Sequence, residues 1–259
     1  MRPWMYFLSD MGEEDPDLAL LKLRYQKAFP QIHCVHLSHQ IQAYQLLQAA
    51  YYWRYLAKNF VKNSIHLLFV GHAQRYLMVN LYDQFLIAPD NGLLTLLSDN
   101  IDEKKVNFYE ISLKNNELNF PALSLIPYLD QFLNQDFMNF NIAETIKTLT
   151  YPKIRFLEHV ILGEIIYLDH YDNAVTNIHR QDFDFFEQKK WRISIKKLFF
   201  IEKITETYHQ VVEGEVFAIF NQNGFLEIAF KGGWKKKYGG AGQLLGLKVG
   251  EKIRIELMV

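Results

Sequence analysis

The sequence is poor in cysteine, in long apolar runs and in excess charge of either sign. Its single cysteine, Cys34, excludes an internal disulfide and suits a reducing compartment. No apolar run approaches the roughly 20 residues that a membrane-spanning helix needs, and the N-terminal stretch reaches Asp10 too early for a secretory apolar core. A formal net charge of −1 gives no general attraction to nucleic acid or to an anionic membrane. These absences predict a cytoplasmic protein without nucleic-acid or membrane partners.

The 259 residues are 49% hydrophobic, which is a globular composition on a chain longer than one core usually holds, so we expect two domains. Strand-like and helix-like segments alternate in the first half. WMYFLSD and IHCVHLS have strand character, and DPDLALLKLRYQKAF has Asp15 as a helix N-cap with Pro16 at the first helical position. IQAYQLLQAAYYWRYLAKNF predicts a long helix. The alternation predicts an α/β domain with a mainly parallel sheet over residues 1–155.

The pattern changes in the second half of the chain. Between Asp99 and Thr150 it is more irregular and more helical, and it includes NIAETIKTL, which we expect to be a helix N-capped by Asn141. Short β-rich runs follow, such as VILGEIIYLD, GEVFAIFN and EKIRIELMV, with Gly and Asn turns between them. They predict a small C-terminal β-barrel over residues 156–259.

One stretch contains more polar groups than its local structure requires. EIIYLDHYDNAVTNIHR, from Glu164 to Arg180, begins as a strand and then continues into a dense series of Asp, His, Asn and Thr residues. A turn needs only one or two such residues to fix its backbone. The remaining donors and acceptors are therefore candidates for a binding site.

Six segments, in chain order, resemble those of the S-adenosylmethionine-dependent hydroxide adenosyltransferases, a family that includes the fluorinase and chlorinase enzymes. The segments are FLSDMGEEDP, HLSHQIQAYQLLQAAY, IAPDNGLL, GEIIYLDHYDNAVTNI, TYHQVVEGE and NQNGFLEIAFKGG with LLGLKVGEKI. The resemblance covers nearly the whole chain. It implies an N-terminal α/β domain, a C-terminal β-barrel and a homotrimer with a nucleoside ligand at each subunit interface. S-adenosylmethionine would be the substrate or ligand, without a further cofactor or a metal.

The resemblance also assigns ligand-binding residues by position. Asp10 would accept hydrogen bonds from the ribose diol, Asp169 would face the amino-acid end and Asn173 the adenine edge. Aromatic and polar contacts would come from Tyr44, Tyr208, Gln222 and Asn223. A sulfonium nucleoside needs such acceptors for its hydroxyls, its adenine edge and its ammonium group.

Each of these positions has a purely structural interpretation as well. Asp10 ends a strand, where an Asp commonly caps the next turn. Asp169 and Asn173 could belong to a hairpin stabilised by Asx turns. Tyr44, expected on a helix surface, would then be a packing residue. The order of the segments favours a functional role most clearly for Asp10 and Asn173.

The chain departs from the family where water would be held and activated. Hydrolytic members show an Asp and an Arg in a D-P-G-V-G…R loop, and a His in an F-H-G-R-D segment. The first loop is FVGHAQRY here, which leaves Arg75 for the arginine place and His72 as a substitute base. In the second segment, aligned on Pro127, Phe120 takes the place of the histidine, and the Arg-Asp pair becomes Ala122 and Leu123. The small-hydroxyl loop of the halide enzymes is missing as well.

Two functions from different classes remain open. In the first, the protein hydrolyses S-adenosylmethionine to adenosine and methionine with a rearranged site around His72 and Arg75. In the second, it has kept the nucleoside pocket and lost the chemistry. A purely structural trimer is disfavoured by the polar pocket residues. An additional segment, GGWKKKYGGAG, would be either a flap over the ligand or a solvated hairpin.

Overall fold

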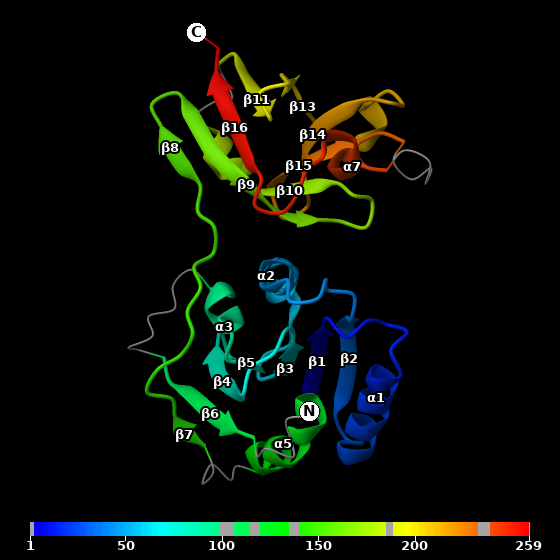
Figure 1. Cartoon of the computed structure of the whole chain (residues 1–259), viewed down its shortest axis with the longest axis vertical. Coiled ribbons are helices and arrows are strands. Elements are labelled where there is room, and N and C mark those ends of the chain that lie inside the picture. Colours follow the sequence, from blue (N-terminus) through cyan, green and yellow to red (C-terminus); the bar gives the residue numbers. More distant parts are fainter. Residues whose placement is uncertain are drawn as a thin grey trace. The chain divides into compact units, whose positions relative to one another are not determined.

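The computed structural model describes residues 3–98, 106–113, 120–134, 140–184, 189–232 and 239–258. The chain divides into two compact units, Met1–Tyr151 and Pro152–Val259, and Figure 1 traces the elements of each. The segment from Trp234 to Tyr238, considered above as a flap or hairpin, lies outside the described residues.

The strands described in the first unit form one seven-stranded sheet in the order β2-β1-β3-β5-β4-β6-β7. These strands are β1 (Trp4–Ser9), β2 (His33–Ser38), β3 (Ile65–Phe69), β4 (Arg75–Leu81), β5 (Gln84–Pro89), β6 (Phe108–Ser112) and β7 (Asn141–Ile142). The neighbouring pairs β2–β1, β1–β3 and β3–β5 are parallel, whereas the pairs β5–β4, β4–β6 and β6–β7 are antiparallel. The sheet is therefore mixed, and only half of it has the expected parallel arrangement.

Helices cover both faces of this sheet. The helices are α1 (Pro16–Ala28), α2 (Leu46–Leu56), α3 (Leu93–Leu96), α4 (Pro121–Ser124) and α5 (Ile126–Leu133), with a short 3-10 turn at Ala57–Asn59. Phe7 of β1 packs in one cluster with residues of α1 and α5. The neighbouring Tyr6 contacts the ring of His66, which in turn contacts Trp53 of α2 on the other face. The alternation of side chains along β1 thus places one helical layer on each side.

Helix α1 forms as the sequence predicts. Asp15 Oδ1 accepts a hydrogen bond from the backbone nitrogen of Asp17 at 2.8 Å, and Pro16 is the first helical residue. Helix α2 begins later than expected, at Leu46, so Tyr44 lies in the preceding loop with φ 64° instead of on the helix surface.

The helix expected from Asn141 does not form, because its backbone pairs elsewhere. Asn141 and Ile142 form strand β7 beside β6. Side chains of other segments accept hydrogen bonds from the backbone after β7. Asp90 Oδ1 accepts from Lys147 N at 2.8 Å, and Thr95 Oγ1 accepts from Leu149 N at 2.9 Å. These long-range hydrogen bonds replace the local helical ones.

The strands described in the second unit form a nine-stranded sheet in the order β12-β11-β16-β9-β10-β15-β14-β13, with β8 paired to β9. The strands are β8 (Arg155–Leu157), β9 (Val160–Leu168), β10 (Ala174–His179), β11 (Trp191–Ile195), β12 (Phe199–Ile201), β13 (Ile204–Thr205), β14 (Val216–Phe220), β15 (Phe225–Phe230) and β16 (Lys252–Leu257). The two end strands, β12 and β13, are joined by Glu202 and Lys203 alone. This short link brings the sheet edges together in a nearly closed, barrel-like form around a cluster of buried isoleucines.

Part of the polar stretch noted in the sequence becomes a buried strand. Ala174–His179 forms β10, whose first five residues are buried between β9 and β15. The second unit also contains α6 (Arg180–Phe183), α7 (Ala241–Leu245) and a 3-10 turn at Tyr208–Gln210. The sequence did not identify β10 as a strand, because its Thr and Asn residues interrupt the apolar pattern.

Candidate functional site

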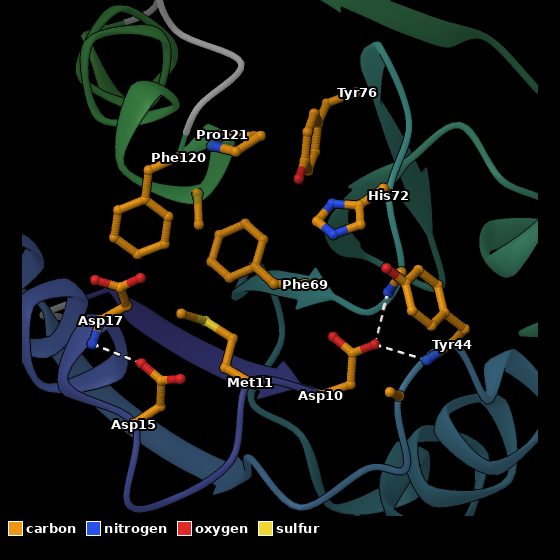
Figure 2. Close-up of a pocket in the computed structure, with 13 residues that line it drawn as sticks. Asp10, Met11, Asp15, Asp17, Tyr44, Phe69, His72, Tyr76, Phe120 and Pro121 are labelled. Atoms are coloured by element: carbon orange, nitrogen blue, oxygen red, sulfur yellow. Dashed lines mark hydrogen bonds between the residues drawn. The ribbon is translucent and has the colours of Figure 1, made fainter.

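A cavity of about 350 Å³ opens at one edge of the first unit's sheet. Asp10 follows the end of β1, His72 lies in the loop after β3, and Tyr76 is the second residue of β4. Because β4 runs antiparallel to β5, its first residues lie at the same edge as the carboxyl ends of the parallel strands. Open α/β sheets bind ligands at this edge. Figure 2 shows the side chains that line the cavity.

The carboxylate of Asp10 is fixed by two backbone groups from different loops. Its Oδ2 atom accepts hydrogen bonds from Tyr44 N at 2.8 Å and from Gly71 N at 3.0 Å (Figure 2). No hydrogen bond between described residues uses Oδ1. An ionised carboxylate has acceptor sites on both oxygens. Asp10 therefore keeps one oxygen available for donors of a ligand.

Both donors to Asp10 lie in left-handed backbone conformations, with φ 64° at Tyr44 and 70° at Gly71. Glycine adopts this region freely, whereas a tyrosine does so at a cost of about 1–2 kcal/mol. The hydrogen bond to the Asp10 carboxylate offsets that cost. The strained backbone of Tyr44 thus lies at the cavity and not in a turn elsewhere in the chain.

Tyr44 and His72 lie together at the cavity. Their rings are tilted with centroids 5.6 Å apart, and the Tyr44 side chain is 62% exposed. An aromatic ring that is mainly exposed at the mouth of a cavity contributes little to the core. This placement agrees with a ligand-contacting role for Tyr44 and leaves the His72 imidazole accessible as a proton acceptor.

The structure does not bring Arg75 into this cavity. Its guanidinium pairs with Asp90 at 2.7 Å and with Glu110 at 2.6 Å, and it also donates to the carbonyl of Thr145. The hydrogen bonds that Arg75 donates to Asp90, reinforced by the one to Glu110, raise the pKa of Arg75 above its ordinary value. The arginine that the sequence offered for holding water is thus engaged in a structural network between β4, β5 and β6.

The apolar replacements seen in the sequence do line the cavity. Phe120, Pro121 and Ala122, at the beginning of α4, belong to its wall (Figure 2). Leu123, the last residue of the aligned segment, packs against the core of the unit instead. The side chains that replace the family's His and Arg therefore face the same cavity as Asp10, and they offer no acid, base or hydrogen-bonding group.

A second cavity, of about 590 Å³, lies in the second unit and is lined by three further predicted binding residues, Asp169, Asn173 and Tyr208. Asp169 Oδ1 accepts from the backbone of Tyr171 at 2.9 Å and from that of Asn173 at 2.8 Å. The Asn173 amide nitrogen donates to Asp169 Oδ2 at 3.0 Å and to the hydroxyl of Tyr208 at 3.3 Å. Because this nitrogen has both hydrogens engaged, the amide oxygen of Asn173 is the group left for a ligand.

Glu227 completes this second cluster, and sequence reasoning did not identify it. Tyr208 donates its hydroxyl hydrogen to Glu227 Oε1 at 2.5 Å. Burial raises the pKa of the Glu227 carboxyl, although the hydrogen bond from Tyr208 opposes the change. Burial also raises the pKa of Tyr208, and the adjacent Glu227 adds to this shift. The sequence signal that could have identified Glu227 was a single carboxylate in the otherwise apolar strand FLEIAF.

Most of the remaining polar residues in the Glu164–Arg180 stretch have structural roles. Asp172 Oδ2 accepts from the backbone of Gln243 at 2.6 Å at the beginning of α7. Asn177 Oδ1 accepts from Glu164 N at 2.7 Å, and its amide nitrogen donates to the Pro152 carbonyl at 3.0 Å. The excess of polar groups is therefore explained largely by the fold, and Asp169 and Asn173 are the members that face a cavity.

Gln222 and Asn223 do not join this cluster. They lie in the turn between β14 and β15, where the Asn223 carbonyl contacts Nε2 of His179 at 2.9 Å. His179 ends β10, whereas Asn173 precedes it. The strand between them is bulged, since Ala174 pairs with Ile228 and His179 with Phe225. Neither Gln222 nor Asn223 belongs to the described lining of this cavity.

The described residues include neither a metal-binding cluster nor a membrane-spanning helix. No group of three or more His, Cys, Asp or Glu side chains among them has an arrangement that would hold a metal ion. None of the helices in the described segments is both long and apolar enough to span a bilayer.

Comparison with known proteins agrees with this architecture. The solved structure of an uncharacterized conserved protein from Thermotoga maritima matches 97% of the chain and 99% of its own length, with a TM-score of 0.79 and 21% identity. A conserved hypothetical protein from Thermus thermophilus matches over the whole of both chains, with a TM-score of 0.70 and 25% identity. The (R)-S-adenosyl-L-methionine hydrolase of Thermus thermophilus is 27% identical, over 98% of the chain and 100% of the relative.

Family models identify both parts of the chain. Residues 5–135 match the N-terminal domain of the SAM hydroxide adenosyltransferases, and residues 163–254 match the C-terminal domain. The two matches occur in the order of the two compact units and include Asp10, Asp169 and Asn173. The chain is a divergent member of the SAM hydroxide adenosyltransferase family.

Proposed function

We propose that the protein binds S-adenosylmethionine with its ribose on Asp10. The observation that carries this proposal is the Asp10 carboxylate, which has one oxygen fixed by Tyr44 N and Gly71 N and the other without a described partner. Vicinal hydroxyls are donors that such an acceptor pairs with well. The described lining also includes the carboxylates of Asp15 and Asp17 but neither lysine nor arginine. This charge favours a sulfonium nucleoside over a nucleotide.

The reaction proposed is hydrolysis to adenosine and L-methionine. Water attacks C5′, the C5′–S bond breaks, and methionine leaves as a neutral thioether. Because the leaving group is a good one, the site needs chiefly to align the water and to exclude bulk solvent. His72, on the cavity wall, would accept the proton that the water releases. The apolar side chains of Phe120, Pro121 and Ala122 on the cavity wall would exclude bulk solvent.

The second cavity would serve the remaining parts of the ligand. Asp169 would pair with the ammonium of the methionine portion, and the free amide oxygen of Asn173 would accept from the adenine amino group. Tyr208 would contribute an aromatic face. In the homotrimer that the family resemblance implies, this set would come from a different subunit than Asp10. A trimer mass by light scattering would support that assembly, and a stable monomer that binds the ligand with full affinity would exclude it.

A second candidate, a nucleoside-binding protein without catalysis, has its own support. The cavity wall at Phe120 and Ala122 lacks a proton acceptor, and Arg75 is held by Asp90 and Glu110 away from the cavity. The hydrolase proposal then assigns proton transfer to His72. A protein that senses or stores an adenosyl compound needs only the acceptor at Asp10.

One experiment separates these functions. Calorimetric titration of the purified protein with S-adenosylmethionine is followed by chromatography of the same sample after long incubation. Binding with the appearance of adenosine and methionine establishes the hydrolase, and a His72→Ala variant should then bind without turnover. Binding with intact ligand supports the non-catalytic alternative. If no heat of binding is observed, the proposed ligand is wrong.

A further inference from the structure

Tyr76 is a buried tyrosine whose hydroxyl has no partner among the described residues. Its side chain is 3% exposed, and it packs edge-to-face against Phe69 with ring centroids 6.4 Å apart. Figure 2 shows its hydroxyl pointing into the cavity that Asp10 lines. Buried tyrosine hydroxyls usually find a hydrogen-bond partner. This one faces the space that a ligand would occupy.

Tyr25, in the same core, shows the usual arrangement. It is also fully buried, but its hydroxyl donates to the Ala122 carbonyl at 2.6 Å. The two tyrosines therefore differ in one respect: Tyr25 has a protein acceptor and Tyr76 has the cavity. Burial raises the pKa of Tyr76, and the negative charge of Asp10 adds to this shift. The Tyr76 hydroxyl therefore keeps its hydrogen at neutral pH and can donate it.

Asp10 and Tyr76 reach the cavity from two different sides. Asp10 follows β1, and Tyr76 belongs to β4, with β3 and β5 between those strands in the sheet. Three strand spacings separate their backbones by roughly 14 Å. In a ribose ring the 2′ and 3′ hydroxyls lie on one face and C5′ on the other. A ribose whose diol pairs with Asp10 on one side of the cavity can therefore extend its 5′ carbon away from Asp10, towards the side from which Tyr76 donates.

We propose that the Tyr76 hydroxyl donates a hydrogen bond to the oxygen atom at the 5′ position of the ligand. This inference rests on the proposed function. In adenosine that atom is the 5′ hydroxyl oxygen, and in the hydrolysis it is the oxygen of the attacking water. The water forms its bond to C5′ while the bond from C5′ to sulfur breaks, and its proton passes to His72. Tyr76 would hold the oxygen in line and is a positioning residue for the nucleophile.

The test compares two ligands that differ only in that oxygen, adenosine and 5′-deoxyadenosine, by calorimetry with the full-length protein. Wild type should bind adenosine about tenfold more tightly, as expected for one hydrogen bond. Tyr76→Phe, which removes only the hydroxyl, should bind both ligands equally. Tyr25→Phe is the matched control and should keep the tenfold preference. A Tyr76→Phe variant that retains the preference overturns the inference.

Thermal unfolding supplies a readout that needs no ligand. Tyr76→Phe removes a hydroxyl without a protein partner, so its Tm should not fall. Tyr25→Phe should lower Tm by about 2–4 °C, because the Ala122 carbonyl loses its donor. An equal fall in Tyr76→Phe would reveal a protein partner and overturn the inference by itself. If wild type binds neither adenosine nor S-adenosylmethionine, the proposed function fails, and the inference fails with it.

Discussion

Asp10 and Tyr44, 34 residues apart in the chain, are joined by a hydrogen bond of 2.8 Å from the Tyr44 backbone nitrogen to the Asp10 carboxylate. The bond holds Tyr44 in a left-handed conformation at the mouth of the cavity. The carboxylate thus has two separate tasks, since one oxygen shapes the loop and the other is available to a ligand. These tasks can be separated by mutation.

Asp10→Asn should separate them. The asparagine oxygen can still accept from Tyr44 N and Gly71 N, but the ligand-facing atom becomes an NH₂ donor and loses its charge. We expect unfolding to be little changed and nucleoside affinity to fall by about 1–3 kcal/mol. Asp10→Ala should lose affinity to a similar extent and also stability. Calorimetric affinity and thermal unfolding measured together check this, and an Asp10→Asn protein with wild-type affinity would remove Asp10 from the site.

Gly71→Ala should disturb the same loop from its other side. Gly71 has φ 70°, and an added Cβ would lie 3.0 Å from the Asn91 side-chain nitrogen and 3.5 Å from Tyr44 Cδ1. We expect a loss of about 1–2 kcal/mol in the free energy of unfolding from the backbone alone, with a further loss from the crowding. Denaturant unfolding measures both.

The matched control for that variant is Gly12→Ala. Gly12 also has a positive φ, 87°, but nothing lies within 4 Å of an added Cβ. It should therefore show the backbone cost only, and nucleoside affinity should fall in Gly71→Ala more than in the control. Equal losses of stability and affinity in the two variants would mean that Gly71 matters only for its backbone conformation.

Local signals in the sequence were sufficient where the structure is determined locally. The Asp15 cap and Pro16 begin α1 as predicted, because both act within one helical turn. Tyr44 was misplaced because its conformation depends on a carboxylate 34 residues away. The helix expected after Asn141 was wrong because that backbone is bound by Asp90 and Thr95. Neither long-range contact leaves a pattern in the neighbouring residues.

The sequence predicted only those residues of the candidate site that lie in segments aligned with those of the family. Asp169, Asn173 and Tyr208 lie around one cavity, and so do Asp10, Tyr44 and His72 around the other. Tyr76 could not be distinguished from core aromatics, because the missing partner of its hydroxyl is a property of packing. The pairing of Arg75 was not predictable either, because Asp90, which follows β5, and Glu110, in β6, are 15 and 35 residues away in the sequence.

Acid should destabilise the protein through a buried histidine. Trp53 Nε1 donates to His66 Nδ1 at 3.1 Å, and the other ring nitrogen contacts Ser64 Oγ at 2.9 Å. The rings of Tyr6, Phe60 and Trp53 surround this imidazole. The network requires the neutral form, and burial lowers the pKa of His66 from 6.5 to about 3.

The sign of the effect follows from the proton balance. Below pH 6.5 the unfolded chain binds a proton at His66 that the folded chain does not, so stability falls from pH 6.5 down to about 3. Between pH 7 and pH 5 this amounts to about 2 kcal/mol. Burial also lowers the pKa of His39, to about 4, and acts in the same direction. Urea unfolding at both pH values should show a smaller difference for His66→Gln than for wild type, and equal differences would contradict this account.

Glu227→Gln should stabilise the second unit at neutral pH. Burial raises the pKa of the Glu227 carboxyl, so the folded chain holds that proton more strongly than the unfolded chain does. Stability therefore falls as the pH rises from the ordinary pKa of 4.5 through the raised one, and the loss persists above it. Glutamine is neutral at every pH and keeps an oxygen for the Tyr208 hydroxyl, which removes the loss.

The comparison variant for Glu227→Gln is Tyr208→Phe. It leaves the buried carboxyl without the donor that now lies 2.5 Å away, and it should cost about 1–3 kcal/mol. Urea unfolding at pH 7 should thus rank Glu227→Gln above wild type and Tyr208→Phe below it. If Glu227→Gln were the less stable protein at pH 7, the carboxylate charge would be making a favourable interaction in the folded state. Lys231, which lines the same cavity, would be the first partner to test.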